Sequence, residues 1–462
     1  MRLEKVVSDA RDPSAPLWDI ELQDGRVQSI HPSEASSDTP PQLLLPPLCH
    51  PHIHLDKAYI LTCNNPCSSQ HPDYSDLCPL SGSFQEALVN TSRAKERYTE
   101  HDLYLRGSQL LATSYTQGVT SMRAFVELDH VTGTLPLTAA IRLKKDFAHL
   151  LEVQICAFAQ DPIFSTAHGD ANRTIIEDAL AQYADWIGAL GTTPYVETSR
   201  EASLSNIEWA IKTALQRRLH LDFHLDYSLK PPSSISSEER PLTFSVVELL
   251  LEHDWTQVTG NSKTIVLGHC TQLSMLEDAE RAALAETIIA SKLPIHFVGL
   301  PTSDIFMMGR PQADAQSSHN RSRGTMHVPS MIRDLGLSAC LSINNVGNAF
   351  TPYGTGDPLQ LASWGVGIYQ TGTVKDAQLL YECVSSRARK AIGMDEGPQC
   401  REIQLGQSVH GMLLLKNQRV VEVPGAPGQP NISVASRPRL SLKDVVWDPP
   451  ELHLRTIVKE SA

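Results

Sequence analysis

The chain has 462 residues, of which 41% are hydrophobic and 20% are charged, so a large packed core is expected and global disorder is not. The formal net charge is −13 and no extended basic run is present, which argues against nucleic acid or an anionic membrane as a partner. The nine cysteines, an odd number, do not suggest a disulfide framework.

The N-terminal residues 1–16 lack the apolar core of a signal peptide, and the sequence has no long uncharged apolar span. We therefore expect a cytoplasmic protein without a membrane partner. An enzyme with a small-molecule substrate is the default expectation for a chain of this kind.

The first residues favour short strands. The segment WDIELQDGRVQSI alternates apolar and polar positions around Asp24-Gly25, a dipeptide typical of a two-residue hairpin turn. A stretch rich in Pro and Ser, 31–41, then leads to the apolar run 43–45. We expect residues 1–45 to form the N-terminal part of a small β module.

From residue 46 on, apolar segments typical of buried strands alternate with amphipathic segments typical of helices. The candidate strands are 43–52, 118–127, 152–160, 185–190, 219–226, 264–270, 293–300 and 337–344. The clearest helical segments are 83–97, 100–117 and 203–217. Thr99 and Asp102 are suited to cap the second helix. Eight strands alternating with helices predict an α/β fold, a (β/α)₈ TIM barrel, over 46–395.

The C-terminal region follows a last helix predicted near 376–393. Residues 406–423, GQSVHGMLLLKNQRVVEV, have the pattern of paired strands. We expect 396–462 to supply the C-terminal part of the β module and a tail, so that both chain ends form one small β-sandwich beside the barrel. Barrels of this size are often homo-oligomers, but no sequence pattern marks an interface.

The segment 48–57, LCHPHIHLDK, places His52 and His54 two positions apart on a strand, so their side chains point the same way. Neutral imidazoles on one face suit Zn²⁺ or Fe²⁺. Such a pair is a weak motif alone. It is strengthened here because it ends the first barrel strand, and barrel sites lie at the C-terminal ends of strands.

Two further histidines end later strands. His224 lies near the end of 219–226, where a third metal ligand belongs, and His269 ends the next strand in VLGHC. His220 and Asp222 on the same strand as His224 are interpreted as buried polar filling. Three strand ends that carry histidine in chain order predict one metal centre at the barrel mouth.

A second metal candidate is weaker. Cys63, Cys67, His71 and Cys78 fall in one expected loop, but their spacing matches no paired zinc knuckle. We favour ordinary loop thiols over a structural zinc site.

The chain resembles the cytosine deaminase branch of the amidohydrolase superfamily over residues 20–420. The resemblance is carried by PHIHLDK, CAFAQD, GALGTTPYVETSRE, FHLDY, LGHCT, FVGLPTSDIFMMGR and TPYGTGDP, in the family's order and approximate spacing. It implies one divalent metal ion, Zn²⁺ or Fe²⁺, with ligands His52, His54 and His224. It further implies that His269 polarises the substrate or handles protons and that Gln160 contacts a substrate amide.

Two positions depart from the family pattern. Asn344, in SINNVGNA, stands where the family has its metal-linked aspartate on strand eight, and Tyr227 stands where a glutamate shuttles protons. An amide can only coordinate or hydrogen-bond, and a phenol with a pKa of about 10 is a poor base at neutral pH. Loss of one proton shuttle costs roughly 10²–10⁴ in rate. Ordinary cytosine deamination is therefore not expected, although both residues stay in the predicted catalytic set.

Four carboxylates are candidates for the missing base: Glu127, Glu197, Asp226 and Asp304 all follow or end predicted barrel strands. Glu197 and Asp304 lie in segments that match the family, so both are predicted to line the site.

Two more positions are predicted to contact the substrate. Lys57 either binds an anionic or carbonyl group of the substrate or forms a salt bridge with Asp56 or another neighbour. Phe306, with Met307 and Met308, forms either an apolar wall of the pocket or ordinary barrel packing.

Three functional interpretations remain open at this point. The favoured one is hydrolysis or deamination of a C–N bond in a small polar or heterocyclic substrate. The second is non-hydrolytic chemistry such as cyclisation, elimination or isomerisation, in which the metal serves as a Lewis acid. The third is a pseudoenzyme that keeps the barrel without hydrolytic activity.

Overall fold

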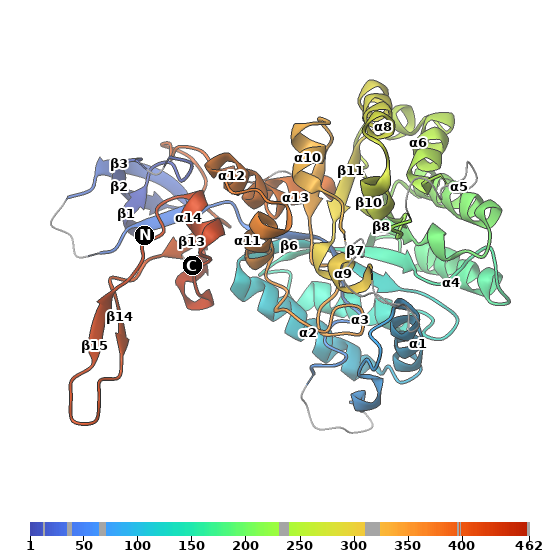
Figure 1. Cartoon of the computed structure of the whole chain (residues 1–462), viewed down its shortest axis with the longest axis horizontal. Coiled ribbons are helices and arrows are strands. Elements are labelled where there is room, and N and C mark those ends of the chain that lie inside the picture. The colour runs from blue at the N-terminus through green and yellow to red at the C-terminus, as the bar shows by residue number, and fades with distance from the viewer. Residues whose placement is uncertain are drawn as a thin grey trace, which may run out of the picture.

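The computed structural model shows a parallel barrel with a β module at its side (Figure 1). It describes residues 1–12, 14–34, 39–63, 71–230, 240–309, 324–394, 397 and 399–459. Among these residues, no helix combines the length and the apolar character needed to cross a membrane.

The barrel consists of eight parallel strands that are hydrogen-bonded in chain order. They are β5 (Leu48–His54), β6 (Val119–Glu127), β7 (Glu152–Ala159), β8 (Ile187–Thr192), β9 (His220–Leu225), β10 (Ile265–His269), β11 (Ile295–Gly299) and β12 (Ala339–Leu341). A parallel bridge between Ile53 and Asn344 joins the first strand to the segment after the last one and closes the ring. The predicted (β/α)₈ barrel is confirmed.

Helices surround the barrel and cover its strands. They are α1 (Phe84–Lys95), α2 (Glu100–Gln117), α3 (Leu135–Asp146), α4 (Gly169–Gln182), α5 (Arg200–Arg217), α6 (Leu242–Glu252), α7 (Trp255–Thr259), α8 (Asp278–Ser291), α9 (Pro301–Met307), α10 (Val328–Arg333), α11 (Pro358–Ile368), α12 (Val374–Cys383) and α13 (Ser386–Ala391). The cap predicted for α2 is present, because the Asp102 amide donates to Thr99 Oγ1 at 3.1 Å. The helix predicted near 376–393 is two helices, α12 and α13.

The β module is built from both ends of the chain, as the sequence indicated. One six-stranded sheet has the order β16-β13-β4-β1-β2-β3. Its strands are β1 (Arg2–Val7), β2 (Leu17–Gln23), β3 (Arg26–Pro32), β4 (Gln42–Leu45), β13 (Leu413–Lys416) and β16 (Arg455–Ile457), and helix α14 (Leu442–Trp447) lies between β13 and β16 in the chain. The predicted hairpin turn is confirmed: Asp24 and Gly25 have φ of 50° and 68°, the left-handed values that a type I′ turn requires.

The two strands expected within 406–423 exist, but they do not pair with each other. β13 pairs with β4 and β16. The next strand, β14 (Val420–Val423), instead pairs with β15 (Ile432–Ala435) in a separate two-stranded ribbon. In Figure 1 this ribbon projects from the module, away from the barrel.

Candidate active site

Three imidazoles converge at the C-terminal ends of β5 and β9. His224 Nε2 lies 3.0 Å from His52 Nε2 and 3.2 Å from His54 Nε2. All three side chains are buried. Within the described part of the chain, theirs is the one group of three or more His, Cys, Asp or Glu residues whose ligand atoms lie within 4.8 Å of one another. The structure thus brings together the three ligands that the sequence predicted.

The chemistry of this cluster fits a cation. Burial lowers the pKa of all three imidazoles, so each is neutral and keeps a nitrogen lone pair. The Nε2 atoms of His52 and His54 both face Nε2 of His224, which carries either one lone pair or one proton. The three imidazoles therefore cannot satisfy one another's hydrogen bonds. A divalent ion that accepts three lone pairs removes this conflict, and Zn²⁺ and Fe²⁺ both favour imidazole nitrogen.

Asn344 lies beside this cluster, three residues after the end of β12, with φ at +66°. Its Nδ2 donates to Ser303 Oγ at 3.0 Å, which leaves Oδ1 as the remaining polar atom of the amide. Oδ1 is buried and has no hydrogen-bond partner among the described residues. An orphaned buried acceptor is costly, and a ligand or a cation in the pocket would satisfy it.

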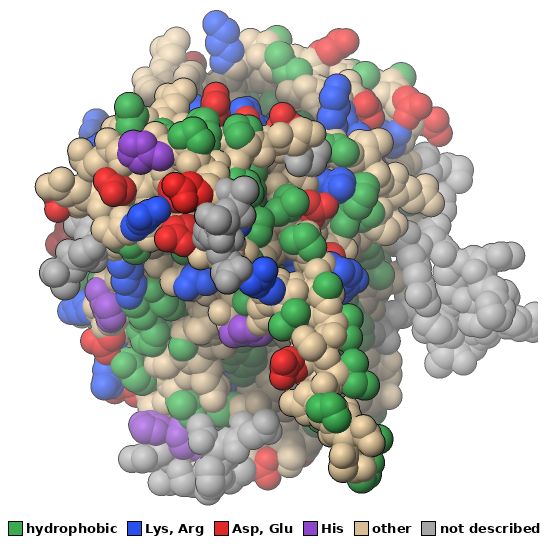
Figure 2. Space-filling model, turned by 90° about the vertical axis from the view of Figure 1, so that its left-hand side faces the viewer, with side chains coloured by type: hydrophobic (Ala, Val, Ile, Leu, Met, Phe, Trp, Pro, Cys, Tyr) green, Lys and Arg blue, Asp and Glu red, His purple; other side chains and the backbone are tan. Residues whose placement is uncertain are grey.

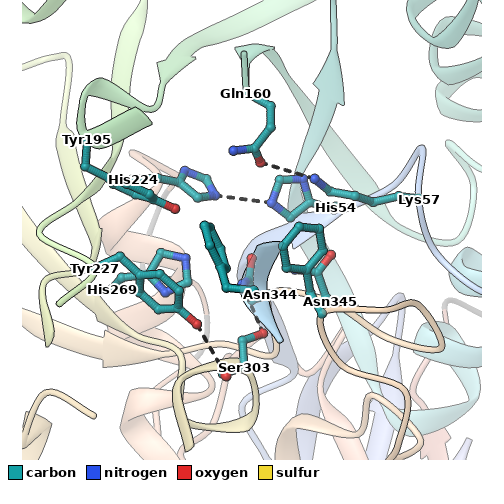
Figure 3. A pocket seen from close by; sticks show the side chains of 12 residues that line it. His54, Lys57, Gln160, Tyr195, His224, Tyr227, His269, Ser303, Asn344 and Asn345 are labelled. Atoms are coloured by element: carbon teal, nitrogen blue, oxygen red, sulfur yellow. Dashed lines mark hydrogen bonds between the residues drawn. The ribbon is translucent and has the colours of Figure 1, made fainter. Parts of the chain in front are cut away.

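His269 ends β10 and lines the same pocket (Figure 3). Its φ of +66° is unusual for a residue other than glycine, and such strain concentrates at functional sites. His269 Nδ1 lies 2.7 Å from Asp304 Oδ1, and Thr325 donates to Asp304 Oδ2 at 2.6 Å. The carboxylate therefore favours the tautomer with its proton on Nδ1, which leaves the lone pair of His269 on Nε2.

Tyr227 packs against this histidine. The centroids of the Tyr227 and His269 rings are 4.5 Å apart. The Tyr227 hydroxyl donates to the backbone carbonyl of Ser303 at a long 3.5 Å. Tyr227 is thus a wall of the pocket whose hydroxyl points toward Ser303.

On the opposite side, Lys57 contacts both Glu127 and Gln160. Its Nζ forms a salt bridge with Glu127 and lies 3.3 Å from Gln160 Oε1. Lys95 also pairs with Glu127: its Nζ lies 2.6 Å from Glu127 Oε2 and 2.8 Å from Asp129 Oδ2. Burial alone raises the pKa of Glu127, but the two ammonium groups outweigh it and the pKa lies below its ordinary value. Lys57 thus forms a buried ion pair and also lines the pocket.

The remaining predicted carboxylates have structural contacts. Glu197 accepts hydrogen bonds from the Ile163 amide at 2.9 Å and from Asn206 Nδ2 at 2.9 Å, so it fastens the loop after β7 and does not line the pocket. Asp226 accepts from the Leu242 amide at 2.7 Å and so caps the first turn of α6. Among the four candidate carboxylates, Asp304 is the one that touches a pocket residue predicted to be catalytic.

Beneath the histidine cluster, Asp222 contacts both a cation and one of the three imidazoles, so it does more than fill the core. It pairs with Arg123 at 2.8 Å, and its other oxygen lies 3.5 Å from His52 Nδ1, where it favours a proton on that nitrogen. His220 lies deeper and its Nδ1 is 3.0 Å from Thr264 Oγ1. The interpretation as buried polar filling therefore fits His220 better than Asp222.

The pocket itself has an empty volume of about 320 Å³ that includes solvent-open space. It is lined by His54, Lys57, Phe84, Gln160, Tyr195, His224, Tyr227, His269, Ser303, Asn344, Asn345 and Phe350. Among the described residues, no carboxylate lines it and Lys57 is the one Lys or Arg in the lining. Phe306 packs beside Tyr353, outside this lining, with ring centroids 5.8 Å apart.

Several lining residues were not singled out from the sequence. Tyr195 and Ser303 lie inside the motifs GALGTTPYVETSRE and FVGLPTSDIFMMGR, so the sequence indicated their segments. A motif does not say which of its side chains face the site. Phe84 comes from α1 and Phe350 from the loop after β12, and neither lies in a quoted motif. Of the weaker zinc candidates, Cys78 is exposed and Cys67 lies outside the described residues.

Several known proteins are similar to the chain. It is 22% identical over 372 residues to the uncharacterized protein YahJ of Escherichia coli K12, a match that covers 76% of the chain and 66% of that protein. It is 21% identical over 360 residues to N-isopropylammelide isopropyl amidohydrolase of Pseudomonas sp. strain ADP, a match that covers 78% of the chain and 77% of that protein. No family model matches the chain.

Two solved structures share the architecture. One is 5-methylcytosine deaminase from Klebsiella pneumoniae bound to 5-fluorocytosine, with a TM-score of 0.71, 21% identity and coverage of 90% and 91%. The other is N-isopropylammelide isopropylaminohydrolase from Burkholderia multivorans, with a TM-score of 0.67, 20% identity and coverage of 99% and 96%. The predicted resemblance is confirmed at the level of the fold.

Proposed function

We propose that this protein is a metal-dependent enzyme that acts on a C–N bond of a small polar or heterocyclic substrate, by hydrolysis or deamination. The observation that carries the proposal is the meeting of three buried imidazoles with a His–Asp pair in one small pocket. Support comes from the named activities of the similar proteins, a 5-methylcytosine deaminase, an N-isopropylammelide isopropylaminohydrolase and an N-isopropylammelide isopropyl amidohydrolase.

His52, His54 and His224 would hold the ion, with Asn344 Oδ1 as a neutral oxygen beside them. When bound, Zn²⁺ or Fe²⁺ supplies Lewis-acid polarisation of a carbonyl or imine. Asn344 adds no negative charge where a carboxylate would, so the pocket keeps more of the cation's field for the substrate.

His269 is the proposed acid and base. Its Nε2 takes a proton from the attacking water and returns it to the departing nitrogen, while Asp304 holds the Nδ1 proton and steadies the imidazolium. Tyr227 packs on the ring and restricts its rotation. This assignment supplies the proton transfer without a carboxylate in the pocket lining.

Lys57 and Gln160 are the proposed substrate contacts. Lys57 presents an ammonium and Gln160 an amide on the side of the pocket opposite His269 (Figure 3). Together they suit a ring carbonyl or an anionic oxygen of the substrate. The aromatic side chains of Phe84 and Phe350 supply apolar surface for a planar ring.

Non-hydrolytic metal chemistry is the second candidate. It is favoured by the pocket lining, which offers imidazole, amide, phenol and ammonium groups but no carboxylate among the described residues. Cyclisation, elimination or isomerisation needs polarisation and one proton carrier, and His269 suffices for that.

The test begins with protein purified without chelator. We expect about one divalent ion per chain by elemental analysis and loss of the ion in His52→Ala. A metal-free wild-type protein whose His52→Ala variant behaves identically would overturn both enzyme proposals in favour of a pseudoenzyme. If Asn344→Asp with Tyr227→Glu gains deaminase activity on cytosine-type rings that the wild type lacks, the second candidate is favoured over the first.

A further inference from the structure

The pocket lining indicates a ligand more sharply than the outer surface of the module does. On the module side of the molecule, hydrophobic, basic and acidic side chains are intermixed (Figure 2), and such a mixture specifies no ligand. The pocket lining, by contrast, includes two amides next to Lys57, those of Gln160 and Asn345. An amide oxygen accepts hydrogen bonds and an amide nitrogen donates them, so the atom that each amide turns to the pocket decides what it binds.

Lys57 fixes the orientation of Gln160. Its Nζ forms a salt bridge with Glu127 and lies 3.3 Å from the side-chain amide of Gln160. An ammonium group can only donate, so the Gln160 atom that faces it is the oxygen, Oε1. Gln160 Nε2 is therefore the atom left for the pocket, and it has no acceptor in the described part of the chain.

Asn348 fixes the orientation of Asn345 in the same way. Its Oδ1 accepts from the backbone amides of Phe350 at 3.0 Å and Thr351 at 3.2 Å, and these groups can only donate. Its Nδ2 therefore points the other way, and donates to the Lys57 carbonyl at 3.0 Å and to Asn345 Oδ1 at 2.8 Å. Because a donor faces Asn345, the atom that meets it is the oxygen. The Nδ2 of Asn345 is left for the pocket.

The Nδ2 group of Asn345 is buried and lacks an acceptor. Asn345 is 3% exposed, and among the described residues no atom accepts a hydrogen bond from its Nδ2. A buried N–H group without a partner is costly, and one that lines a pocket is satisfied when a ligand atom accepts from it. The N–H groups of Asn345 and Gln160 therefore indicate a ligand that carries acceptors.

Lys57, Gln160 and Asn345 form one side of the pocket, which we call the donor edge. Figure 3 shows them on the side away from His269. The two amide oxygens of this edge are already bonded, one to Lys57 and the other to Asn348. The charge of Lys57 is balanced by its salt bridge. The donor edge thus offers N–H groups to a ligand, while its own side-chain oxygens are occupied.

We propose that the substrate presents oxygen acceptors, and no N–H group, to the donor edge. The proposed substrate class rests on the proposed function, since it concerns the same pocket. It is a planar ring that carries either a carboxylate group or a ring carbonyl without a neighbouring N–H. A cytosine-type edge, with an N–H group beside the carbonyl, would set its N–H against Gln160 Nε2 or Asn345 Nδ2. Two opposed donors cannot bond each other, so such a ring is rejected.

The experiment is isothermal titration calorimetry of the full chain, purified without chelator, with small planar probes. Benzoate, benzamide and benzamidine share one ring, and their substituents present acceptors alone, an acceptor with a donor, and donors alone. In the neutral pair 2-pyranone and 2-pyridone, a ring oxygen replaces the ring N–H beside the carbonyl. We expect the acceptor-only probe of at least one pair to bind about tenfold more tightly than its partner, and benzamidine not to bind.

The two probe pairs separate the two sources of the acceptors. A preference for benzoate over benzamide alone assigns a carboxylate, and a preference for 2-pyranone over 2-pyridone assigns a ring carbonyl. Benzamide and 2-pyridone that bind as tightly as their partners, or more tightly, would overturn the proposal. Absence of binding by every probe at millimolar concentration would also overturn it.

Two isosteric variants test the donor edge itself. Asn345→Asp and Gln160→Glu replace the nitrogen that faces the pocket by an oxygen, while the other oxygen still accepts from Asn348 or Lys57. Each variant should weaken binding of the preferred probe about tenfold and reduce its advantage over its partner. A preference that survives both substitutions would overturn the assignment to the donor edge.

Gln154→Glu is the matched control. Gln154 lies on β7, the strand that leads to Gln160, and its Oε1 accepts from Arg123 at 2.6 Å, outside the pocket lining. The control should rank the probes as the wild type does, and an equal loss of preference in it would overturn the assignment. Thermal unfolding and metal content show whether each variant is folded.

Calorimetry needs no turnover, so this proposal and the proposed function fail separately. A wild type that ranks the probes as expected but cleaves no C–N bond would overturn the proposed function alone. A wild type that cleaves C–N bonds but binds both members of each pair equally would overturn the acceptor-only substrate alone.

Discussion

Two buried polar clusters meet in the pocket, and they differ in whether they satisfy themselves. In the ionic cluster, Lys57 and Lys95 share Glu127, and Asp129 pairs with Lys95. In the histidine cluster, three neutral imidazoles turn their Nε2 atoms toward one another without enough protons to bond. The ionic cluster pairs its own charges, whereas we propose that a cation completes the histidine cluster. We therefore assign ion binding to the histidine cluster and the positioning of Lys57 to the ionic cluster.

Removal of one imidazole gives the largest expected effect. We expect His224→Ala to lose the bound ion and all metal-dependent activity, because His224 Nε2 is the atom that both other histidines face. Elemental analysis after gel filtration measures this. His50→Gln is the matched control, since His50 is buried on the same strand but outside the cluster, and it should keep the ion.

The proton carrier gives the next effect. Asp304→Asn keeps the size of the side chain but cannot favour the Nδ1 proton of His269, so kcat should fall roughly 10²–10⁴-fold. Metal content should not change, which separates this residue from the ligands. A variant with wild-type kcat would remove His269 and Asp304 from the proton-transfer step.

A substitution in the ionic cluster should lower the free energy of unfolding and leave the metal content unchanged. Glu127→Gln leaves two buried ammonium groups with one fewer carboxylate, and breaking a buried pair costs about 3–5 kcal/mol in the free energy of unfolding. Urea unfolding measures this loss.

The same carboxylate predicts a dependence on pH. The pKa of Glu127 is below its ordinary value, so its contribution to stability is present above that value and is lost as pH falls through the lowered pKa. We expect the acid limb of the stability profile to be shallower in Glu127→Gln. An acid limb that is the same in wild type and Glu127→Gln would contradict the ion pairing of Glu127 with Lys57 and Lys95.

The smallest effect is expected at the substrate contact. Lys57→Met should raise KM by about tenfold, the value of one charge-assisted hydrogen bond, with kcat largely unchanged. Steady-state kinetics on any accepted substrate separate the two constants. A fall in kcat with constant KM would instead place Lys57 in the chemical step.

The sequence predicted the barrel because its signals are local. Apolar strands alternate with amphipathic helices, and the spacing of His52 and His54 puts both on one face of a strand. The closure of the ring and the position of His224 follow from the same alternation. The three imidazoles could therefore be placed before any contact was known.

Pairings between distant segments had no such signal. The partner of His269 is Asp304, 35 residues away, and the sequence offered four candidate carboxylates without indicating which one contacts His269. Lys95 joins Glu127 from a separate helix, and no motif marks it. Glu197 lies in a matching motif, yet its carboxylate faces backbone amides, because a motif does not fix the direction of a side chain.

We propose that the histidine cluster holds one divalent ion. Anomalous diffraction at the zinc and iron absorption edges, from crystals grown without chelator or added metal, tests it most directly. We expect one peak, about 2.0–2.1 Å from the Nε2 atoms of His52, His54 and His224. Clear density for three imidazoles with no anomalous peak between them would contradict it.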